Sequence, residues 1–162
     1  MKKLLSVVLV MSVAGALHTV QAQDYKTALG VRLSSSNAKQ NNSVSFKQFI
    51  SDKAAIEALF TFGDPLALGA LLEIHKPLSA SGMTWFYGGG GYISFDKKLN
   101  NNTGKETTEP NFGAQGVIGL DYKFSGIPLN LSLDWKPELN LVSDINFEPA
   151  AIGFTARFTF GK

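Results

Sequence analysis

The sequence predicts an all-β fold: an eight-stranded antiparallel up-and-down transmembrane β-barrel, preceded by a cleavable signal peptide. Three observations lead to this prediction. The chain begins with the layout of an export leader, eight later segments alternate between apolar and polar side chains, and no run after the leader is long and apolar enough for a membrane helix. The chain also has 16 glycines, 12 phenylalanines and no cysteine, which favours a β-rich fold that no disulfide stabilises.

Residues 1–22 are predicted to be the signal peptide. Two lysines precede an apolar run over residues 4–17, and residues 20–22 (VQA) offer a small-residue cleavage site. The run is shorter than the roughly 20 apolar residues of a membrane helix. Residues 23–162 are then the barrel domain, in which 13 of the 15 basic residues remain against 13 acidic ones. This balance gives no reason to expect a nucleic-acid partner.

The first two predicted strands cover residues 25–34 and 44–50. In the first, apolar side chains such as Val31 alternate with polar ones such as Arg32. The second is less regular, because Gln48 interrupts its apolar face. Both have the period of two that indicates a strand with one apolar face.

The third and fourth predicted strands cover residues 53–62 and 66–75. Their apolar faces are continuous, whereas Glu57 and Glu73 lie on the opposite faces. Residues 54–60 are rich in Ala, Glu and Leu, which are good helix formers, so a helix is the alternative for this segment.

The last four predicted strands cover residues 83–96, 112–124, 129–136 and 151–160. The alternation of the fifth strand survives the glycine run at residues 88–91. Strands of roughly nine to twelve residues are long enough to cross a bilayer at a tilt, whereas an ordinary soluble strand has about five or six.

The two faces of these strands differ in chemistry. Bulky apolar groups collect on one face, and small or charged groups collect on the other. In a small membrane barrel the polar face lines the lumen, where opposite charges pair, and the apolar face meets lipid. The predicted lumen charge network consists of Arg32, Glu57, Glu73, His75, Asp121, Lys123, Asp134, Lys136 and Arg157. The alternative is a soluble lipocalin-like barrel or sandwich with a solvated polar face.

Outward aromatic side chains are candidates for girdles at the two membrane interfaces. They are Tyr25, Trp85, Tyr87, Tyr122, Phe124, Trp135, Phe158 and Phe160. Several of them are predicted to lie near the periplasmic ends of their strands, with Trp135 deeper.

Connection lengths predict the orientation of the barrel. With the N-terminus in the periplasm, the external connections are residues 35–42, 63–65, 97–111 and 142–150. The periplasmic connections are residues 51–52, 76–82 and 125–128. The two longest polar connections fall outside, as in known outer-membrane barrels. The eighth strand must pair with the first, because an open edge in hydrocarbon leaves backbone groups unsatisfied.

The C-terminal third carries a family resemblance. Residues 119–124 (GLDYKF), 127–137 (IPLNLSLDWKP) and 156–160 (ARFTF) resemble the small OmpX/OmpA-type outer-membrane β-barrel family, and similar barrels are common in Bacteroidetes-type bacteria. Together with the leader and the eight strands, the resemblance covers the whole mature chain, and its specific part is the C-terminal third. It implies export through a cleaved signal peptide to the bacterial outer membrane.

The resemblance also implies partners. These are outer-membrane lipid and, during biogenesis, the outer-membrane assembly machinery, which in this family reads terminal aromatics on the last strand. Phe158 and Phe160 match that assembly signal, although Gly161 and Lys162 follow where the family usually ends on Phe. Phe160 can equally be one more lipid-facing aromatic. We expect the barrel to be a monomer.

No catalytic, cofactor-binding or metal-binding residue is predicted. His75 is the one histidine after the leader, and Lys76 and Pro77 follow it, so no serine stands beside it in the sequence. A hydrogen-bonding lumen histidine is favoured. The acidic lumen residues are interleaved with bases, which favours structural salt bridges over a cation site.

The glycine run at residues 88–91 is not predicted to bind phosphate. It lies inside a strand, whereas a phosphate-binding loop joins a strand to a helix. The glycines are expected to make room for bulky lumen residues or to allow the strand to bend.

The function predicted from the sequence is a small outer-membrane barrel protein with a structural or surface-interaction role, whose lumen is closed by the charge network. Two alternatives remain open. A lipid-modifying enzyme would need a serine within reach of His75 on an accessible surface, and a narrow channel or small-ligand carrier would need a continuous water path along the lumen.

Overall fold

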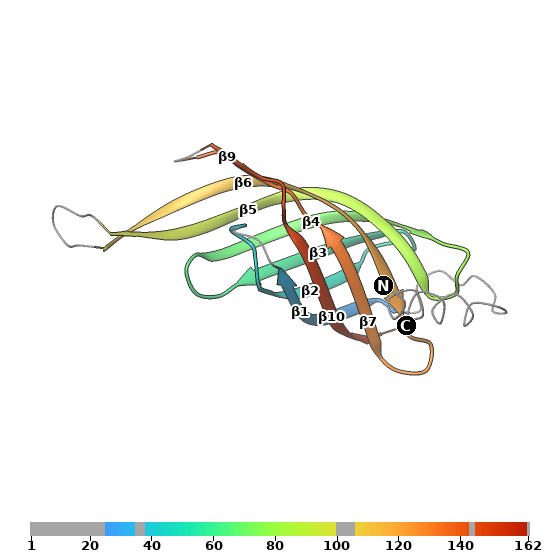
Figure 1. The fold of residues 1–162 in the computed structure, drawn as a ribbon. Coiled ribbons are helices and arrows are strands. Elements are labelled where there is room, and N and C mark those ends of the chain that lie inside the picture. Colours follow the sequence, from blue (N-terminus) through green and yellow to red (C-terminus); the bar gives the residue numbers. More distant parts are fainter. Residues whose placement is uncertain (1–24, 35–37, 100–105, 143–144, 162) are drawn as a thin grey trace, which may run out of the picture.

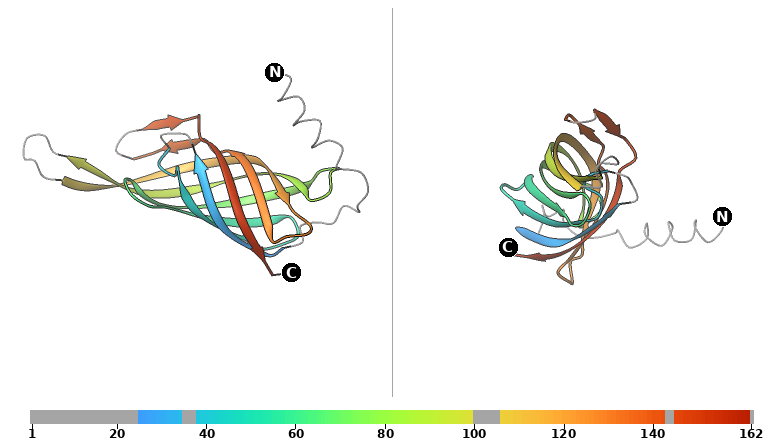
Figure 2. Two further views of the ribbon diagram at one scale, coloured as in Figure 1. Left: turned by 60° about the horizontal axis from the view of Figure 1, so that its bottom comes forward. Right: turned by 90° about the vertical axis from the view of Figure 1, so that its left-hand side faces the viewer.

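The computed structural model describes residues 25–34, 38–99, 106–142 and 145–161, so the predicted signal peptide lies outside the described residues. The ten strands of the described residues form one antiparallel sheet in the order β5-β4-β3-β2-β1-β10-β7-β6-β8-β9. Pairing of β5 with β6 closes this sheet into a barrel (Figures 1 and 2). Among the described residues, no helix is long and apolar enough to cross a membrane.

The strands are β1 (Thr27–Ser34), β2 (Ser43–Phe49), β3 (Ala54–Thr61), β4 (Leu66–Pro77), β5 (Met83–Leu99), β6 (Glu106–Lys123), β7 (Leu129–Trp135), β8 (Glu138–Asn140), β9 (Asn146–Glu148) and β10 (Ile152–Phe160). The all-β prediction is confirmed, and the helical alternative for residues 54–60 is wrong because these residues pair as β3 between β2 and β4.

The ten strands occupy eight positions around the barrel, which are here called staves. Two of the staves are each made of two consecutive strands separated by a short interruption. β7 and β8 pair with β6 in one continuous register, from Ile118↔Trp135 to Gln115↔Glu138. Pro137 lies between them and has no N–H for the ladder. β9 and β10 follow each other on the next stave, separated by residues 149–151. The prediction of an eight-stranded barrel is therefore confirmed.

Closure occurs between the first and last staves. β1 pairs with β10 over eight residues, from Thr27↔Phe160 to Ser34↔Gly153. The backbone N–H of Lys26 also donates to the carbonyl of Gly161 at 3.0 Å. Both termini of the described chain thus lie at one end, here called the terminal end, together with the turns that follow β2, β4 and β6 (Figure 2). The opposite end is called the loop end.

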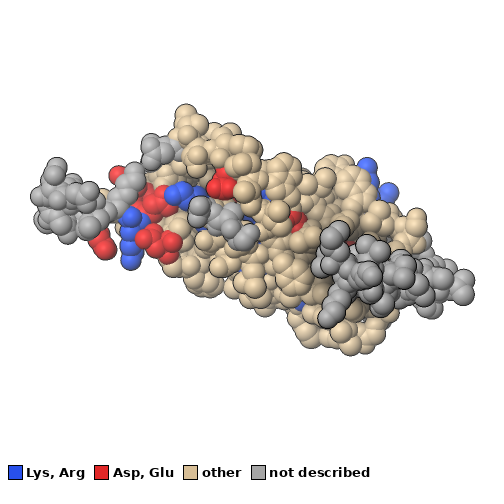
Figure 3. Space-filling model, in the orientation of Figure 1, with Lys and Arg blue, Asp and Glu red and all other residues tan. Residues whose placement is uncertain are grey.

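The barrel is polar inside and apolar outside. Arg32, Lys47, Glu73 and Arg157 are each at most 2% exposed, whereas the outward Leu33 is 58% exposed. On the face shown in Figure 3, charged side chains gather mainly at the loop end, and the wall is mostly uncharged. A soluble barrel or sandwich would show the reverse arrangement, with its apolar groups in the interior.

Six of the eight aromatics predicted to face outward form a belt near the terminal end. Three ring pairs make up this aromatic belt: Trp85 with Tyr87, Tyr122 with Phe124, and Phe158 with Phe160. Trp135 lies instead toward the loop end of β7, opposite Ile152. The prediction that Tyr25 faces outward is wrong. Tyr25 precedes β1, is 4% exposed and packs edge-on against Phe49, because the strand alternation begins only at Thr27.

Two of the predicted loops are partly strand. β5 continues to Leu99 and β6 begins at Glu106, so most of the predicted 97–111 connection is a hairpin that projects from the loop end (Figure 1). The predicted 142–150 connection contains β9, which pairs with β8. In β5 and β6 backbone pairing continues past Pro110, from Phe95↔Pro110 to Leu99↔Glu106.

The glycine run in β5 serves close strand approach. A Cβ at Gly88 would lie 2.0 Å from the carbonyl oxygen of Leu72, and one at Gly90 would lie 1.9 Å from that of Ala70. Both contacts are with the backbone of β4, which cannot yield as a flexible side chain can. At these two positions glycine therefore permits close approach of the β4 backbone, a use that differs from the predicted space for a lumen side chain.

Placing Arg at Leu133 should reduce the free energy of unfolding by about 2 to 4 kcal/mol, because Leu133 lies in the middle of β7 and faces outward. Urea titration of the barrel folded in phosphatidylcholine vesicles measures this loss. Ile127→Arg is the control, since Ile127 is similarly exposed but lies in the turn at the terminal end, where the cost falls to about 0 to 1 kcal/mol. Equal losses at the two positions would contradict the assigned lipid-facing wall.

Candidate functional site

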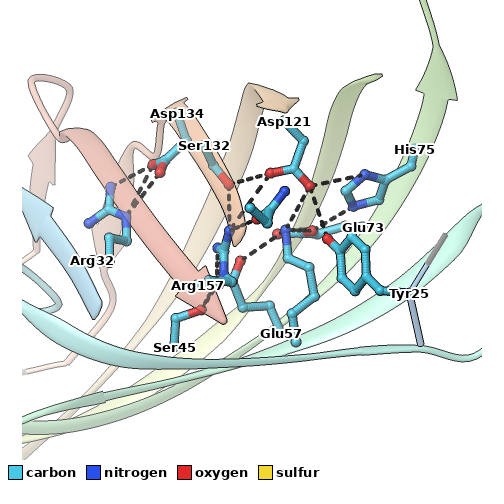
Figure 4. A network of polar contacts seen from close by, with 12 residues as sticks. Tyr25, Arg32, Ser45, Glu57, Glu73, His75, Asp121, Ser132, Asp134 and Arg157 are labelled. Atoms are coloured by element: carbon cyan, nitrogen blue, oxygen red, sulfur yellow. Dashed lines mark hydrogen bonds and ion pairs between the residues drawn. The ribbon is translucent and has the colours of Figure 1, made fainter. Parts of the chain in front are cut away.

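The interior of the barrel contains two groups of polar side chains (Figure 4). The larger, here called the central network, consists of Arg157, Glu57, Lys47, Glu73, His75 and Asp121, with Tyr25, Ser45, Asn130 and Ser132 as hydrogen-bonding partners. The second, called the mouth cluster, lies toward the loop end and consists of Arg32, Asp134, Gln40, Gln115, Lys136 and Glu138.

Arg157 on β10 connects four staves in the central network. Its guanidinium donates to the carboxylate of Glu57 on β3 and to the hydroxyl of Ser132 on β7. It also donates to Ser45 Oγ at 2.7 Å and to Asn130 Oδ1 at 3.2 Å. A planar guanidinium with five donors suits this role, because it can satisfy several acceptors at fixed angles.

Lys47 on β2 is the second cation of the central network. Its Nζ lies 2.8 Å from Glu73 Oε2, 3.8 Å from Glu57 Oε2 and 3.9 Å from Asp121 Oδ2. The same ammonium lies 4.5 Å from the centre of the Phe86 ring. A buried point charge placed among three carboxylates offsets their desolvation without needing one fixed geometry.

His75 lies between acidic groups and aromatic rings. Its Nε2 is 2.9 Å from Glu73 Oε2, and its Nδ1 is 3.8 Å from Asp121 Oδ2. The imidazole stacks on Phe86 with ring centres 5.0 Å apart and meets Phe49 at 4.9 Å. The side chain is 1% exposed, so its surroundings are those of a packing and hydrogen-bonding residue.

Asp121 joins the two halves of the central network. Its carboxylate accepts hydrogen bonds from Ser132 Oγ and, at 3.4 Å, from the Tyr25 hydroxyl. It also lies 3.7 Å from Arg157 Nη1. The three carboxylates of the network thus face two permanent cations and one histidine in a space closed to solvent. Removing one member would leave its partner charged and buried, which is strongly unfavourable.

The mouth cluster fixes the first loop over the barrel opening. Arg32 pairs with Asp134 at 2.6 Å and donates to the backbone carbonyls of Gln40 and Asn41 at 3.4 and 3.3 Å. The Gln40 side chain is fully buried and donates to the carbonyl of Leu59 at 3.1 Å. Ala38 and Gln40 are therefore packed against the interior of the barrel, whereas Asn42 is exposed.

Glu138 on β8 anchors this loop from the opposite side. Its carboxylate accepts hydrogen bonds from the backbone N–H of Lys39 at 2.8 Å and of Gln40 at 3.3 Å. Lys136 Nζ lies 2.5 Å from the same carboxylate and donates to Gln115 Oε1 at 3.1 Å. Charge-assisted bonds of this kind are stronger than neutral ones.

Eight of the nine predicted lumen residues belong to one of the two polar groups of the interior, and one lies outside both. Glu57, Glu73, His75, Asp121 and Arg157 lie together in the central network, whereas Arg32, Asp134 and Lys136 lie in the mouth cluster. Lys123 joins neither set. Its Nζ donates to the backbone carbonyls of Phe124 and Ile127 in the turn after β6, so it caps the terminal end.

Lys47 and Glu138 were missed by the sequence prediction. Lys47 has the same parity as Ser45 and Phe49, the lumen-facing residues of β2, so alternation alone could have assigned it to the interior. Glu138 follows Pro137, where the predicted strand had ended at residue 136. Its interior position became visible only once β8 continued the register of β7.

Phe158 and Phe160, the predicted assembly signal, face outward on β10 and are 58% and 44% exposed. They belong to the aromatic belt, and Phe158 pairs with Leu29 while Phe160 pairs with Thr27. In the described part of the chain, no group of three His, Cys, Asp or Glu side chains has the arrangement of a metal site.

Comparisons with known proteins identify the fold. No family model and no curated protein matches the sequence. Among solved structures, the N-terminal β-barrel domain of Pseudomonas aeruginosa OprF is similar, with a TM-score of 0.60 and 13% sequence identity. The match covers 86% of this chain and 100% of the OprF domain. The chain therefore has the eight-stranded β-barrel fold of that OprF domain.

Proposed function

We propose that this protein is a small, monomeric barrel of the bacterial outer membrane, with a closed lumen and a structural or surface-interaction role. The observation that carries the proposal is the interior itself. Ion pairs link strands that are not neighbours across the lumen, and Lys39 and Gln40 of the first loop are hydrogen-bonded at its mouth. A barrel of eight strands has an interior just wide enough for such side chains.

The apolar wall and the aromatic belt support a place in a bilayer. Outward-facing side chains are apolar along the staves, and the belt collects near the terminal end, as expected for residues at an interface. The short turns of that end agree with a periplasmic location, and the long hairpins with an external one. In this proposal the leader directs export, and Phe158 and Phe160 contribute to recognition by the assembly machinery.

The geometry around His75 favours a non-enzymatic role. A lipid-modifying enzyme must bring its base and its nucleophile to a surface that the substrate can reach. His75 is 1% exposed and contacts two carboxylates and two aromatic rings deep in the interior. These contacts fix the imidazole within the packing of the barrel.

The contacts of the interior also disfavour a channel. Arg157 and Lys47 occupy the centre of the barrel with almost no exposure, and the mouth cluster lies above them. Water or a solute would have to separate buried ion pairs to pass, at a cost of several kcal/mol per unpaired charge.

Fractionation of cells that express the full chain tests the proposed location. We expect the protein in the outer-membrane fraction, with a gel mobility that changes on heating because a closed barrel resists detergent until it is boiled. Soluble periplasmic protein without heat-dependent mobility would overturn the proposal.

Planar-bilayer recordings test the closed lumen. We expect the purified, folded barrel to add no steady conductance to the bilayer, because side chains fill its interior. The Lys47→Ala, Arg157→Ala variant is the comparison, with folding checked by heat-dependent mobility. Porin-sized conductance from the unaltered protein would contradict the closed lumen and make the channel the better function.

Glu57→Gln should reduce the free energy of unfolding by about 3 to 5 kcal/mol, because it leaves Arg157 and Lys47 short of a buried counter-charge. Urea titration in phosphatidylcholine vesicles, followed by tryptophan fluorescence, measures the change. Lys39→Gln is the control, since it breaks the more exposed pair with Asp96 and should cost about 1 kcal/mol or less. Similar losses for both variants would show that the central network has no special role in stability.

A further inference from the structure

The β8–β9 hairpin extends the barrel wall at the loop end. β8 continues the β7 stave on the edge of β6, and β9 pairs with β8 through Glu138↔Glu148, Leu139↔Phe147 and Asn140↔Asn146. In both views the hairpin stands outside the outline of the barrel (Figures 1 and 2). One of its two faces is therefore turned away from the lumen.

The outward face of this hairpin is strongly apolar. Leu139 and Phe147 are cross-strand partners on this face and are 37% and 58% exposed. Leu141 and Ile145 share their parity and are 52% and 82% exposed. The polar residues of the hairpin, including Asn146, have the opposite parity. An exposed face of four large apolar side chains marks a contact surface.

This face is continuous with the wall assigned to lipid. From Leu129 to Leu141 every outward residue of the β7–β8 stave is apolar, and the register on β6 does not change. Ten residues separate Leu129 from Leu139, which at about 3.3 Å per residue and a tilt of about 40° spans about 25 Å, the height of the apolar band of such barrels. Leu139 thus lies at the upper edge of the band, and Phe147 beside it.

The β5–β6 hairpin provides an internal contrast. Its outward residues change from Phe112 to Pro110, Thr108 and Glu106 as β6 leaves the barrel, and Lys97 follows Phe95 on β5. That hairpin becomes polar where the band ends, as a segment in water should. By the β6–β8 register, Leu139 and Leu141 lie level with Ala114 and Phe112, below the point at which β6 becomes polar, so the β8–β9 hairpin lies at the level of the apolar wall.

We propose that the β8–β9 hairpin is an interfacial membrane anchor: Leu139, Leu141, Ile145 and Phe147 insert among the acyl chains of the outer leaflet, while Asn146 on the opposite face stays in water. This inference rests on the proposed bilayer location. The hairpin then holds the loop end of the barrel against the lipid on the side of β7 and β10.

Site-directed spin labelling tests the anchor directly, because the chain has no cysteine and any single introduced cysteine can carry the label. Phe147→Cys reports on the apolar face, and Asn146→Cys is the matched control on the other face of the same strand. Leu133→Cys reports on the lipid-facing wall, and Thr108→Cys on the polar hairpin. Each variant is folded in phosphatidylcholine vesicles, and its folding is checked by heat-dependent gel mobility.

The measured quantity is the ratio of collision rates of the label with oxygen, which concentrates in lipid, and with a water-soluble nickel chelate. We expect a severalfold higher ratio at residue 147 than at residues 146 and 108, and a value close to that at residue 133. Free access of the chelate to residue 147 would overturn the anchor while leaving the barrel in the bilayer. Shielding from both reagents would indicate a protein partner or second copy and would also overturn it. Free access to residue 133 would instead overturn the proposed bilayer location.

Discussion

A strand edge in hydrocarbon has no water to satisfy its backbone N–H and C=O groups, so the sheet of a membrane-crossing β-protein has to close. In this chain the β1–β10 ladder satisfies that constraint with eight paired residues. Closure then leaves each side chain only two places, the outer wall or a narrow interior. The inverted distribution of polarity, with Arg157 and Lys47 inside and Leu33 outside, follows from this choice.

The narrow interior explains why its polar residues are so densely connected. A buried charge is tolerated only when counter-charges and hydrogen-bond partners surround it. Arg157 meets Glu57, Ser45, Ser132 and Asn130, and Lys47 lies among three carboxylates. These contacts tie β2, β3, β4, β6, β7 and β10 together across the lumen, so the same side chains that fill the barrel also brace it.

The two ends of the barrel differ because the staves have unequal lengths. At the terminal end, short turns join the strands and the aromatic belt lies beside them. At the loop end, one hairpin continues with polar outward residues and the other with apolar ones. Residues 39–41 lie at the barrel opening, where Arg32 and Glu138 hold them by hydrogen bonds. Any surface-interaction role would therefore use the loop end.

The sequence by itself determined the strands and the face on which nearly every side chain lies, because the period of two assigns each residue of a strand to one of two faces. It placed Glu57 and Arg157 inside in this way. Only the tertiary structure decided which side chains meet: Arg157 pairs with Glu57 from 100 residues away, and Arg32 with Asp134 from 102. It also turned Tyr25 inward and continued the wall past Pro137. Alternation leaves the register between distant strands open, and register sets the height at which each lumen side chain finds its partner.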